Sequence, residues 1–586
     1  MNIKKWLNNS GVLHRVSKPS RYFGNELNIK RKKVADKLRF LFVFPDTYEI
    51  GMSHTGLKIL YRILNESADI YAERAFLPWK DMFFEMKNNN IPLYSLETYS
   101  SANSFDIIGI TLQYELSYTN ILGILDLCNI PFFSVNRTDE PLIVGGGPCM
   151  INPEPVSDFF DFFVIGDGEE ITLDVSKIIK ENLTLLREGR RGELLSKIGK
   201  LDGIYVPQLN QKSIKKKFFK SLSDSEIETR PIVPFYEIVH DRASIELLRG
   251  CSRSCRFCAA GFFYRPVRER TYEEIIKAVP ELIENTGYGE LSLLSLSTMD
   301  YTSIKKLTNI LYKYMSESKI SLSLPSTRVD NFGIEIASKI ASIKKTGLTF
   351  APEAGTQRMR DIINKNISEK DIISTAKKAF DSGWERIKLY FMIGLPTERD
   401  EDIYGIVDLS RMIKRIGFRQ LNVSVGIFIP KPFTPFQFEK QISIEEAKEK
   451  IKKLYVINKF GKLSISDPKK ATIEGIFSRG DRKLSSLIVD AYNKGCIYDE
   501  WTEEFDYNKW VSAFEKSDIS PENYLSKIPY EKNNPWEKID MGIDKDFLIS
   551  ENKKALLEKT TADCRWNDCS NCGICMNFNL KNILNE

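Results

Sequence analysis

Three cysteines in the middle of the chain have the clearest chemistry in the sequence. Cys251, Cys255 and Cys258 stand at C-x3-C-x2-C spacing, directly after the mainly apolar run 243–248. Thiolates are the usual ligands of iron–sulfur clusters, and three of them leave one iron of a 4Fe–4S cluster without a protein ligand. A zinc site short of one ligand and a chance group of buried thiols are the alternatives, but structural zinc has four protein ligands. The spacing therefore favours a 4Fe–4S cluster whose open iron can do chemistry.

A second group of cysteines lies near the end of the chain. Its members, at C-x4-C-x2-C-x2-C spacing, are Cys564, Cys569, Cys572 and Cys575. Four thiolates this close predict a metal site. Complete ligation by four cysteines suits a second 4Fe–4S cluster, for electron delivery or for structure, and it also suits a structural zinc ion.

The central motif resembles that of the radical S-adenosylmethionine (SAM) superfamily. The aromatic Phe257 before the last cysteine and the position of the motif after a predicted strand both fit this family. In the superfamily the amino and carboxylate groups of SAM occupy the open iron, and an electron cleaves SAM to a 5′-deoxyadenosyl radical. The resemblance also implies an electron donor such as flavodoxin or ferredoxin.

Residues after the predicted barrel strands match the SAM-contacting positions of the superfamily. Ser297 stands where many members carry a Gly-Gly-Glu turn for the amino group of SAM, although the glutamate is absent here. Arg328 would hold the SAM carboxylate through a charge-assisted bond, and Glu353 would meet other polar groups of SAM. Gly394 and Glu398 resemble the motif near the adenine. Structural or surface ion pairs are the alternative for Arg328 and Glu353.

Three N-terminal stretches resemble the cobalamin-binding domain that precedes the barrel in one branch of the superfamily. They are PDTYEIGMSHTG (45–56), GGGP (145–148) and IGDGEE (165–170). In the D-x-H-x-x-G pattern of cobalamin proteins a histidine binds cobalt, whereas Asp46, Tyr48 and Gly51 here carry tyrosine at that place. The nearby His54 would either bind cobalt or begin a helix. The groove for the nucleotide tail is expected at Gly145, Gly146, Gly147, Gly166, Gly168 and Glu169. Plain turns and helix starts are the alternative for these glycines.

Alternating strands and helices must position these groups. The predicted strands before the central motif lie at 39–46, 106–115, 141–149 and 162–170, and those of the barrel lie at 243–248, 291–298, 320–327, 347–355, 386–398 and 421–436. Strands separated by helices imply parallel sheets with ligands at the carboxyl ends of the strands. The sequence thus predicts an α/β fold with a doubly wound, Rossmann-like cobalamin-binding domain and a partial (β/α)6 barrel of the TIM type.

Length and composition indicate several units. The chain has 586 residues and a net charge of +5, which is too small to argue for a nucleic-acid partner. No stretch of the sequence resembles a membrane span or a signal peptide, so we expect a cytoplasmic protein without a membrane partner. The expected units are a basic N-terminal extension (1–35), the cobalamin-binding domain (36–175), a connector with a hairpin (176–240), the barrel (241–440), a helical domain (441–550) and a Cys-rich tail (551–586).

The function implied by the resemblance is that of a cobalamin-dependent radical SAM enzyme. Methyl transfer to an unactivated carbon is the expected reaction. A non-methylating radical reaction, such as ring contraction, cyclisation or sulfur insertion, is one alternative, and an RNA- or ribosome-associated factor that uses its clusters structurally is another. The substrate, whether RNA, protein or a small molecule, is not specified by the sequence.

Overall fold

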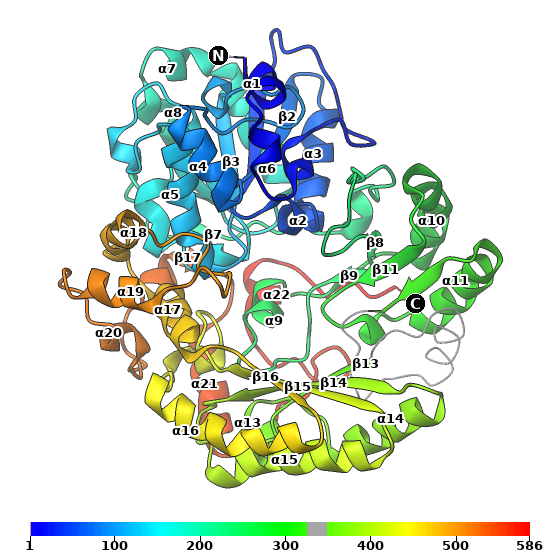
Figure 1. Ribbon diagram of the computed structural model, residues 1–586. Helices are drawn as coiled ribbons and strands as arrows, with labels where there is room; N and C mark the ends of the chain where they lie inside the picture. The colour runs from blue at the N-terminus through cyan, green and yellow to red at the C-terminus, as the bar shows by residue number, and fades with distance from the viewer. Residues whose placement is uncertain (1, 325–347, 586) are drawn as a thin grey trace.

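The computed structural model describes residues 2–324 and 348–585, which build an α/β fold with mostly parallel sheets. Figure 1 shows the N-terminal sheet and its helices at the top, a small sheet with α10 and α11 at the right, and a further sheet with α14, α15 and α16 at the bottom. The predicted α/β class is therefore confirmed.

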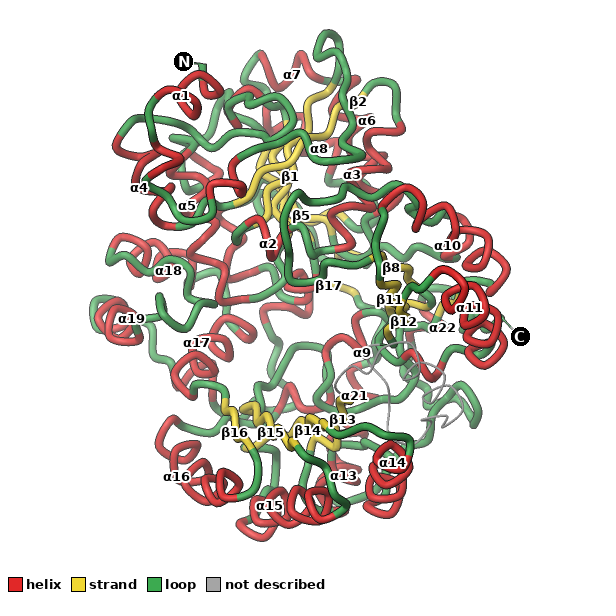
Figure 2. The backbone as a smooth tube through the Cα atoms, turned by 45° about the vertical axis from the view of Figure 1, so that its right-hand side comes forward, coloured by secondary structure: helices red, strands yellow, loops and turns green. Residues whose placement is uncertain are grey.

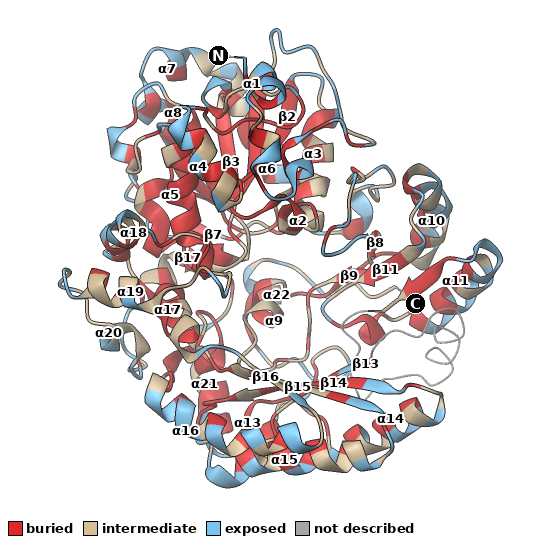
Figure 3. Ribbon diagram, viewed as in Figure 1, coloured by how far each residue is buried: buried red, intermediate tan, exposed pale blue. Residues whose placement is uncertain are grey.

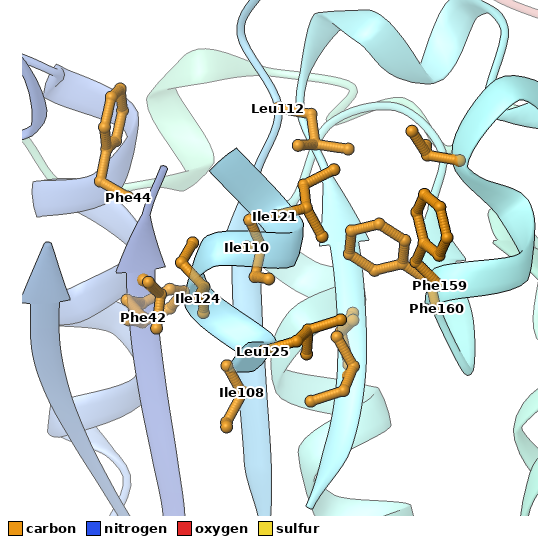
Figure 4. Packing of buried hydrophobic residues seen from close by; sticks show 14 of the residues in the cluster. Phe42, Phe44, Ile108, Ile110, Leu112, Ile121, Ile124, Leu125, Phe159 and Phe160 are labelled. Atoms are coloured by element: carbon orange, nitrogen blue, oxygen red, sulfur yellow. The ribbon is translucent and has the colours of Figure 1, made fainter. Parts of the chain in front are cut away.

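The N-terminal sheet has six strands in the order β2-β1-β3-β4-β5-β6, and only the pair β5 and β6 is antiparallel. Every residue of β1 is buried, and burial on both faces explains its apolar run 40–44. Ile108 and Ile110 of β3 lie beside Ile121 and Ile124 of α5 in this core (Figure 4). The strands are β1 (Leu38–Phe44), β2 (Ile70–Phe76), β3 (Ile107–Thr111), β4 (Leu142–Gly146), β5 (Phe162–Val164) and β6 (Ile204–Tyr205). The helices are α2 (Tyr48–Gly51), α3 (Thr55–Glu66), α4 (Lys80–Asn88), α5 (Tyr118–Leu127), α6 (Glu169–Glu181), α7 (Leu183–Arg187) and α8 (Arg191–Ile198).

Strand β2 is missing from the sequence predictions because it carries two charged residues. Both are buried and paired. Glu73 lies 2.7 Å from an arginine of β1, and Arg74 lies 2.7 Å from Glu97 and 3.1 Å from Glu26. Buried charges are tolerated when they are paired, so this strand has no apolar signature of its own.

The basic N-terminal extension (1–35) contributes buried residues to the N-terminal core. Helix α1 (Ile3–Asn9) buries Ile3 and Leu7 in the N-terminal core. Lys32, in the basic run 30–33, donates hydrogen bonds of 2.7 Å to two backbone carbonyls. The charge run therefore includes a structural residue.

The hairpin expected in the connector 176–240 is also corrected. β6 pairs with β5 and closes the N-terminal sheet, whereas β7 (Ile214–Lys215) pairs with β17 (Ile539–Asp540). The two segments have the composition of hairpin strands, but each finds its partner elsewhere in the chain.

Two parallel sheets follow, of which one has the order β12-β11-β8 and the other β13-β14-β15-β16. The first contains β8 (Ala243–Glu246), β11 (Glu290–Leu294) and β12 (Ser321–Ser323), with β9 (Leu248–Arg249) and β10 (Arg268–Glu269) as a short ribbon, and the second contains β13 (Leu348–Glu353), β14 (Arg386–Ile393), β15 (Gln420–Ile427) and β16 (Lys462–Ile465). The helices are α9 (Ala259–Phe263), α10 (Tyr272–Thr286), α11 (Ile304–Ser318), α13 (Gln357–Ile362), α14 (Glu369–Asp381), α15 (Asp400–Arg415) and α16 (Ile444–Leu454).

The six predicted barrel strands correspond to β8, β11, β12, β13, β14 and β15, and β16 adds a seventh. This strand lies within 441–550, so that region is not only helical as expected. Burial alternates along β14 and β15. Figure 3 shows helices α14, α15 and α16 with exposed outer faces, and Figure 2 shows them on one side of the strands.

The C-terminal segment 468–514 packs against the N-terminal part of the chain. Trp510 is fully buried, lies 5.4 Å from Phe477 between ring centroids, and belongs to the N-terminal hydrophobic core. The expected separate helical core is therefore an extension of the N-terminal core. The remaining C-terminal helices are α17 (Pro468–Arg479), α18 (Leu484–Asn493), α19 (Tyr507–Phe514), α20 (Glu522–Leu525), α21 (Lys545–Leu556) and α22 (Ile574–Asn577).

Candidate functional site

A cavity of about 590 Å³ lies between the carboxyl ends of the N-terminal strands and the start of the β8–β11 sheet. Gly145 to Pro148 and Gly166 to Glu169 line one side, and Glu246, Arg249 and Gly250 line the other. Gly250 directly precedes Cys251 in the sequence. The cavity thus brings the predicted glycine loops next to the predicted cluster loop, in agreement with the rule for parallel sheets.

The glycines at the cavity differ in what they allow. A Cβ on Gly146 would meet nothing within 4 Å, so this residue leaves space open at the wall. Gly147 has φ +108°, and a Cβ there would lie 2.6 Å from the carbonyl oxygen of Leu112. Gly166 has φ +112°, and its Cβ would lie 2.1 Å from the carbonyl oxygen of Lys217. Only glycine fits the last two positions without strain.

Gly145 and Gly168 line the same cavity, but their close neighbours are side chains. A Cβ on Gly145 would lie 2.4 Å from the ring of Phe163, and one on Gly168 would lie 3.3 Å from Leu60. Both glycines therefore serve packing behind the wall. The structure brings all six predicted residues of the two glycine loops to the cavity.

His54 lines the cavity and begins helix α3. Its Nδ1 accepts a hydrogen bond of 3.0 Å from the backbone N–H of Leu57, which makes it the N-cap. Burial lowers the pKa of His54 to about 4, against the hydrogen bond with Gln113. A neutral imidazole that accepts through Nδ1 carries its hydrogen on Nε2. The predicted helix-start alternative is thus what the geometry favours.

Asp46, Tyr48 and Gly51 lie away from the cavity, which corrects their expected role in cofactor binding. Asp46 accepts a hydrogen bond of 3.0 Å from the indole of Trp501, and burial raises its pKa to about 6. The Tyr48 hydroxyl donates to Glu26 at 3.0 Å inside the core. A Cβ on Gly51 would collide with the ring of Phe76 and with the Cβ of Phe44. The motif therefore packs the domain at this point.

An ion-pair network on the cavity wall was not predicted. Arg249 lies 2.7 Å from Glu169, 2.9 Å from Glu246 and 3.1 Å from Asp167. Asp167 also lies 2.6 Å from Arg268. Burial opposes ionisation of Asp167, but the arginines outweigh it and lower its pKa. Arg249 stands two residues before the cluster motif, and that position is the signal that could have identified it.

The three central cysteines lie on one loop that ends at helix α9. Cys258 is the N-cap of this helix, and its Sγ accepts from the N–H of Gly261 at 3.4 Å. Burial raises the pKa of Cys258 to about 12, and the neighbouring Cys255 and Cys251 add to this effect. The three sulfurs are therefore near enough to influence each other, and positive charge would be required to hold them as thiolates.

Two of the residues predicted to contact SAM or the cluster, Phe257 and Glu353, lie near this loop, and Glu353 forms an ion pair. Phe257 packs in a small apolar cluster with Ala354. Glu353, at φ +67°, lies 3.1 Å from Lys365, and Lys365 in turn acts electrostatically on Cys258. The ion-pair alternative predicted for Glu353 is thus present, at the edge of the cluster loop.

The other SAM positions have local roles or lie outside the described residues. Ser297 is buried and precedes the short 3-10 helix Thr298–Asp300. Glu398 accepts a hydrogen bond of 2.7 Å from the N–H of Gly394 and lies 3.0 Å from Lys450. It therefore closes the loop after β14 onto α16. Arg328 lies in 325–347, outside the described residues.

Two of the C-terminal cysteines, Cys564 and Cys572, interact with Arg265, whose Nε donates to the carbonyl of Cys251 at 3.2 Å. Cys572 is buried, Cys569 is exposed, and the other two are intermediate. Burial raises the pKa of Cys564 and of Cys575, and the neighbouring cysteines contribute. Among the described residues, no three His, Cys, Asp or Glu side chains are drawn together as ligands of one metal ion. Ligands of an iron–sulfur cluster bind separate irons, so they need not meet at one point.

Two family models match successive parts of this chain. Residues 56–207 match the family of N-terminal domains of radical SAM proteins, and residues 245–410 match the radical SAM superfamily. The Uncharacterized protein MJ0966 of Methanocaldococcus jannaschii is 28% identical over 81% of this chain and 96% of its own length. The tRNA-2-methylthio-N(6)-dimethylallyladenosine synthase of Petrotoga mobilis is 23% identical over 40% of this chain and 57% of its own length.

Solved structures show looser similarity. The radical SAM methyltransferase TsrM of Kitasatospora setae, solved with tryptophan and a SAM analog, has 15% identity and a TM-score of 0.47, over 70% of this chain and 76% of its own. The cobalamin-dependent SAM radical enzyme OxsB has 11% identity and a TM-score of 0.48, over 89% of this chain and 79% of its own. None of the helices in the described residues is long and apolar enough to span a membrane.

Proposed function

We propose that this chain, whose residues 245–410 match the radical SAM superfamily, is a cobalamin-dependent methyltransferase that acts on an unactivated carbon. The observation that carries this proposal is the cavity shared by the glycine loops and the segment next to Cys251. When bound, the cluster and SAM would supply the radical that activates the substrate, and cobalamin would carry the methyl group.

The cavity wall supports cobalamin as its ligand. Gly146 leaves open space at the wall. Gly147 and Gly166 have backbone conformations that favour glycine, so no side chain projects from these two positions. Such surfaces let a large ring system or a phosphorylated tail approach the backbone. His54 offers no lone pair on Nε2 while Nδ1 caps α3, so we infer that cobalt has no protein ligand here.

The chain's own residues would hold and separate the reacting groups. Cys251, Cys255 and Cys258 would bind the cluster, which leaves one iron for SAM. Arg249 fixes the strand before the cluster against Glu169 of the glycine loop. The protein thus orients the two cofactors and excludes water from the radical. We place the SAM methionine near Ser297 and Glu353.

A second candidate function is radical modification of tRNA without simple methylation. The relatives of this chain include synthases whose name states that they form a 2-methylthio group on a tRNA adenosine. Their alignments cover 40% and 50% of this chain, and 57% and 64% of their own lengths. Sulfur insertion on RNA therefore stays the alternative, and a role as a factor with purely structural clusters is the non-catalytic one.

Product analysis separates these functions. The reconstituted protein, reduced without oxygen and supplied with SAM and cobalamin, should form 5′-deoxyadenosine and S-adenosylhomocysteine in the presence of substrate. Formation of 5′-deoxyadenosine alone would favour another radical reaction. If neither compound is formed, an enzymatic role is contradicted. Comparison of RNA, ribosomal proteins and metabolites with and without the gene should show a product heavier by one methylene.

Replacement of the central cysteines tests the assignment of the cofactors. The variant Cys251→Ala/Cys255→Ala/Cys258→Ala should lose all 5′-deoxyadenosine formation and still bind one cobalamin, because the thiols hold only the cluster. Cys128→Ala, at a buried cysteine of the N-terminal core, is the control and should retain both. Persistent SAM cleavage in the triple variant would refute the cluster assignment.

A further inference from the structure

We propose that Cys564, Cys569, Cys572 and Cys575 bind a second 4Fe–4S cluster directly beside the first, and that Arg265 is a positioning residue shared by the two sites. This inference rests on the radical SAM assignment for the first cluster but not on cobalamin or methyl transfer. It commits the tail to one of the two metals that the spacing of its cysteines allows.

Backbone pairing docks the tail onto the cluster segment. The N–H of Ile583 donates to the carbonyl of Val267 at 2.8 Å, and the N–H of Glu269 donates to the carbonyl of Ile583 at 3.0 Å. Asn582 accepts from the N–H of Val267 at 3.0 Å. The chain end is thus paired with β10, which begins 10 residues after Cys258. A free tail would show no such ladder.

Ion pairs tie the start of the tail to the cluster loop itself. Arg253, between the first two ligands, lies 2.5 Å from Asp300 and 3.2 Å from Asp563. Arg565, next to Cys564, lies 3.3 Å from the same Asp300. The Arg253 side chain is 14% exposed, and those of Asp300 and Asp563 are less exposed. Buried pairs of this kind fix geometry, so the two cysteine groups are held in one arrangement.

Apolar packing completes the contact. Phe262 of α9 lies in one hydrophobic cluster with Cys572 and Ile574 of the tail. Gly573 has φ +91°, and a Cβ there would lie 2.6 Å from Asp544. The turn between Cys572 and Ile574 therefore requires glycine.

Arg265 lies between the two cysteine groups. Its side chain is buried at 2% exposure. Nε donates to the carbonyl of Cys251 at 3.2 Å, and Nη2 donates to Ser254 at 2.9 Å. The guanidinium also interacts with the thiols of Cys572, Cys564 and Cys251. Nη1 is buried without a hydrogen-bond partner among the described residues. A buried donor costs free energy until it finds an acceptor, and cluster sulfur or a thiolate would supply one.

The arrangement favours a cluster over zinc. Nη1 of Arg265 is buried without a hydrogen-bond partner among the described residues, and the inorganic sulfides of a cluster are acceptors that a zinc ion held by four thiolates does not have. A cluster with its four thiolates is negatively charged, and the buried Arg265 places a positive charge beside it. The same charge lies beside Cys251 of the first site.

Metal analysis of the full-length protein tests the site. After anaerobic reconstitution the wild-type chain should hold about eight irons, four for each cluster. Cys569→Ala/Cys575→Ala and the triple Ala variant of the central cysteines should each hold about four. Cys496→Ala, at a buried cysteine far from either group in the sequence, should hold about eight. One zinc per chain that is lost from the tail variant would overturn the proposal.

Redox titration followed by electron paramagnetic resonance tests the role of Arg265. Arg265→Gln removes a buried positive charge, so the reduction potentials of both clusters should become more negative. Arg265→Lys should restore most of the shift, because it keeps the charge. A shift in one cluster alone would show that Arg265 is not shared. If Arg265→Gln fails to fold, two other measurements still test the proposal. Arg265→Lys should have reduction potentials close to those of the wild type, and magnetic coupling between the two reduced clusters should be present in the wild type and absent from Cys569→Ala/Cys575→Ala. Absence of a signal from a cluster at the central cysteines would instead refute the radical SAM assignment.

Discussion

Arg249 Nη2 lies 2.7 Å from Glu169 Oε1, and this ion pair joins the strand before the cluster loop to the first turn of α6. The Arg249 side chain is only 13% exposed, and its guanidinium also meets Asp167 and Glu246. Arg249 therefore helps to fix the relative position of the two cavity walls, together with Arg268, which also pairs with Asp167. Helix α6 begins at Glu169, where a carboxylate is favourable at the amino end of the helix.

Replacement of Arg249 should destabilise the protein more than loss of an exposed arginine does. Arg249→Met leaves carboxylates of the wall without their partner, so the free energy of unfolding should fall by about 3 kcal/mol. Arg419→Met is the control, because this side chain is 86% exposed and its carboxylate partner lies 4.0 Å away. Its effect should be below about 0.5 kcal/mol. Urea unfolding measures both, and equal midpoints would contradict a structural role for Arg249.

Two adjacent glycines of the cavity should respond differently to alanine. Gly146→Ala places a methyl group in open space at the wall, so cobalamin binding should weaken while stability stays close to wild type. Gly147→Ala forces a side chain onto φ +108° beside the Leu112 carbonyl and should cost about 1–3 kcal/mol of stability. Binding measured by absorbance and unfolding measured in urea separate the two effects. Unchanged binding in the folded Gly146→Ala protein would argue against this wall as the cofactor site.

Local signals account for the parts of this site that the sequence predicts. The glycine loops at 145–147 and 166–168 and the cysteine triplet at 251–258 are compact motifs, and one cavity is lined by the glycine loops and by Gly250, which directly precedes Cys251. The sequence pattern does not indicate strand β2, because this strand contains Glu73 and Arg74, which are buried with charged partners. The pairing of Ile583 with Val267 spans more than 300 residues and leaves no pattern in either segment. The predicted position of Tyr48 at the cofactor site is wrong, because a motif match does not specify the direction in which a side chain points.

The pH dependence of stability should contain a contribution from His54. Burial lowers its pKa to about 4, from an ordinary value of 6.5, while the hydrogen bond with Gln113 opposes and the charge of Lys58 adds to this shift. Between these values the unfolded chain binds a proton that the folded chain does not, so stability must fall as the pH falls from 6.5 to 4. Above pH 6.5 the contribution is complete.

The matched variant for this effect is His54→Asn, which keeps a side-chain acceptor for the N-cap and has no titrating group. Its unfolding free energy should depend less steeply on pH than that of the wild type between pH 6.5 and 4. Both proteins should behave alike above that range. Parallel curves across the whole range, from urea unfolding at a series of pH values, would show that His54 is not held neutral.

Cobalt should be free of a protein nitrogen ligand on its lower face. Tyr48 is buried against Glu26 and outside the cavity, and His54 uses Nδ1 to cap α3 with its hydrogen on Nε2. The cob(II) form of the complex should therefore show no nitrogen superhyperfine splitting in electron paramagnetic resonance. His54→Ala should leave that spectrum unchanged and retain most methyl transfer, with a loss of about 1 kcal/mol of stability from the missing cap. His240→Ala is the control for the other histidine at the cavity. Splitting that is present in the wild type and disappears only in His54→Ala would identify His54 as the ligand, because the N-cap bond would then have to give way to cobalt.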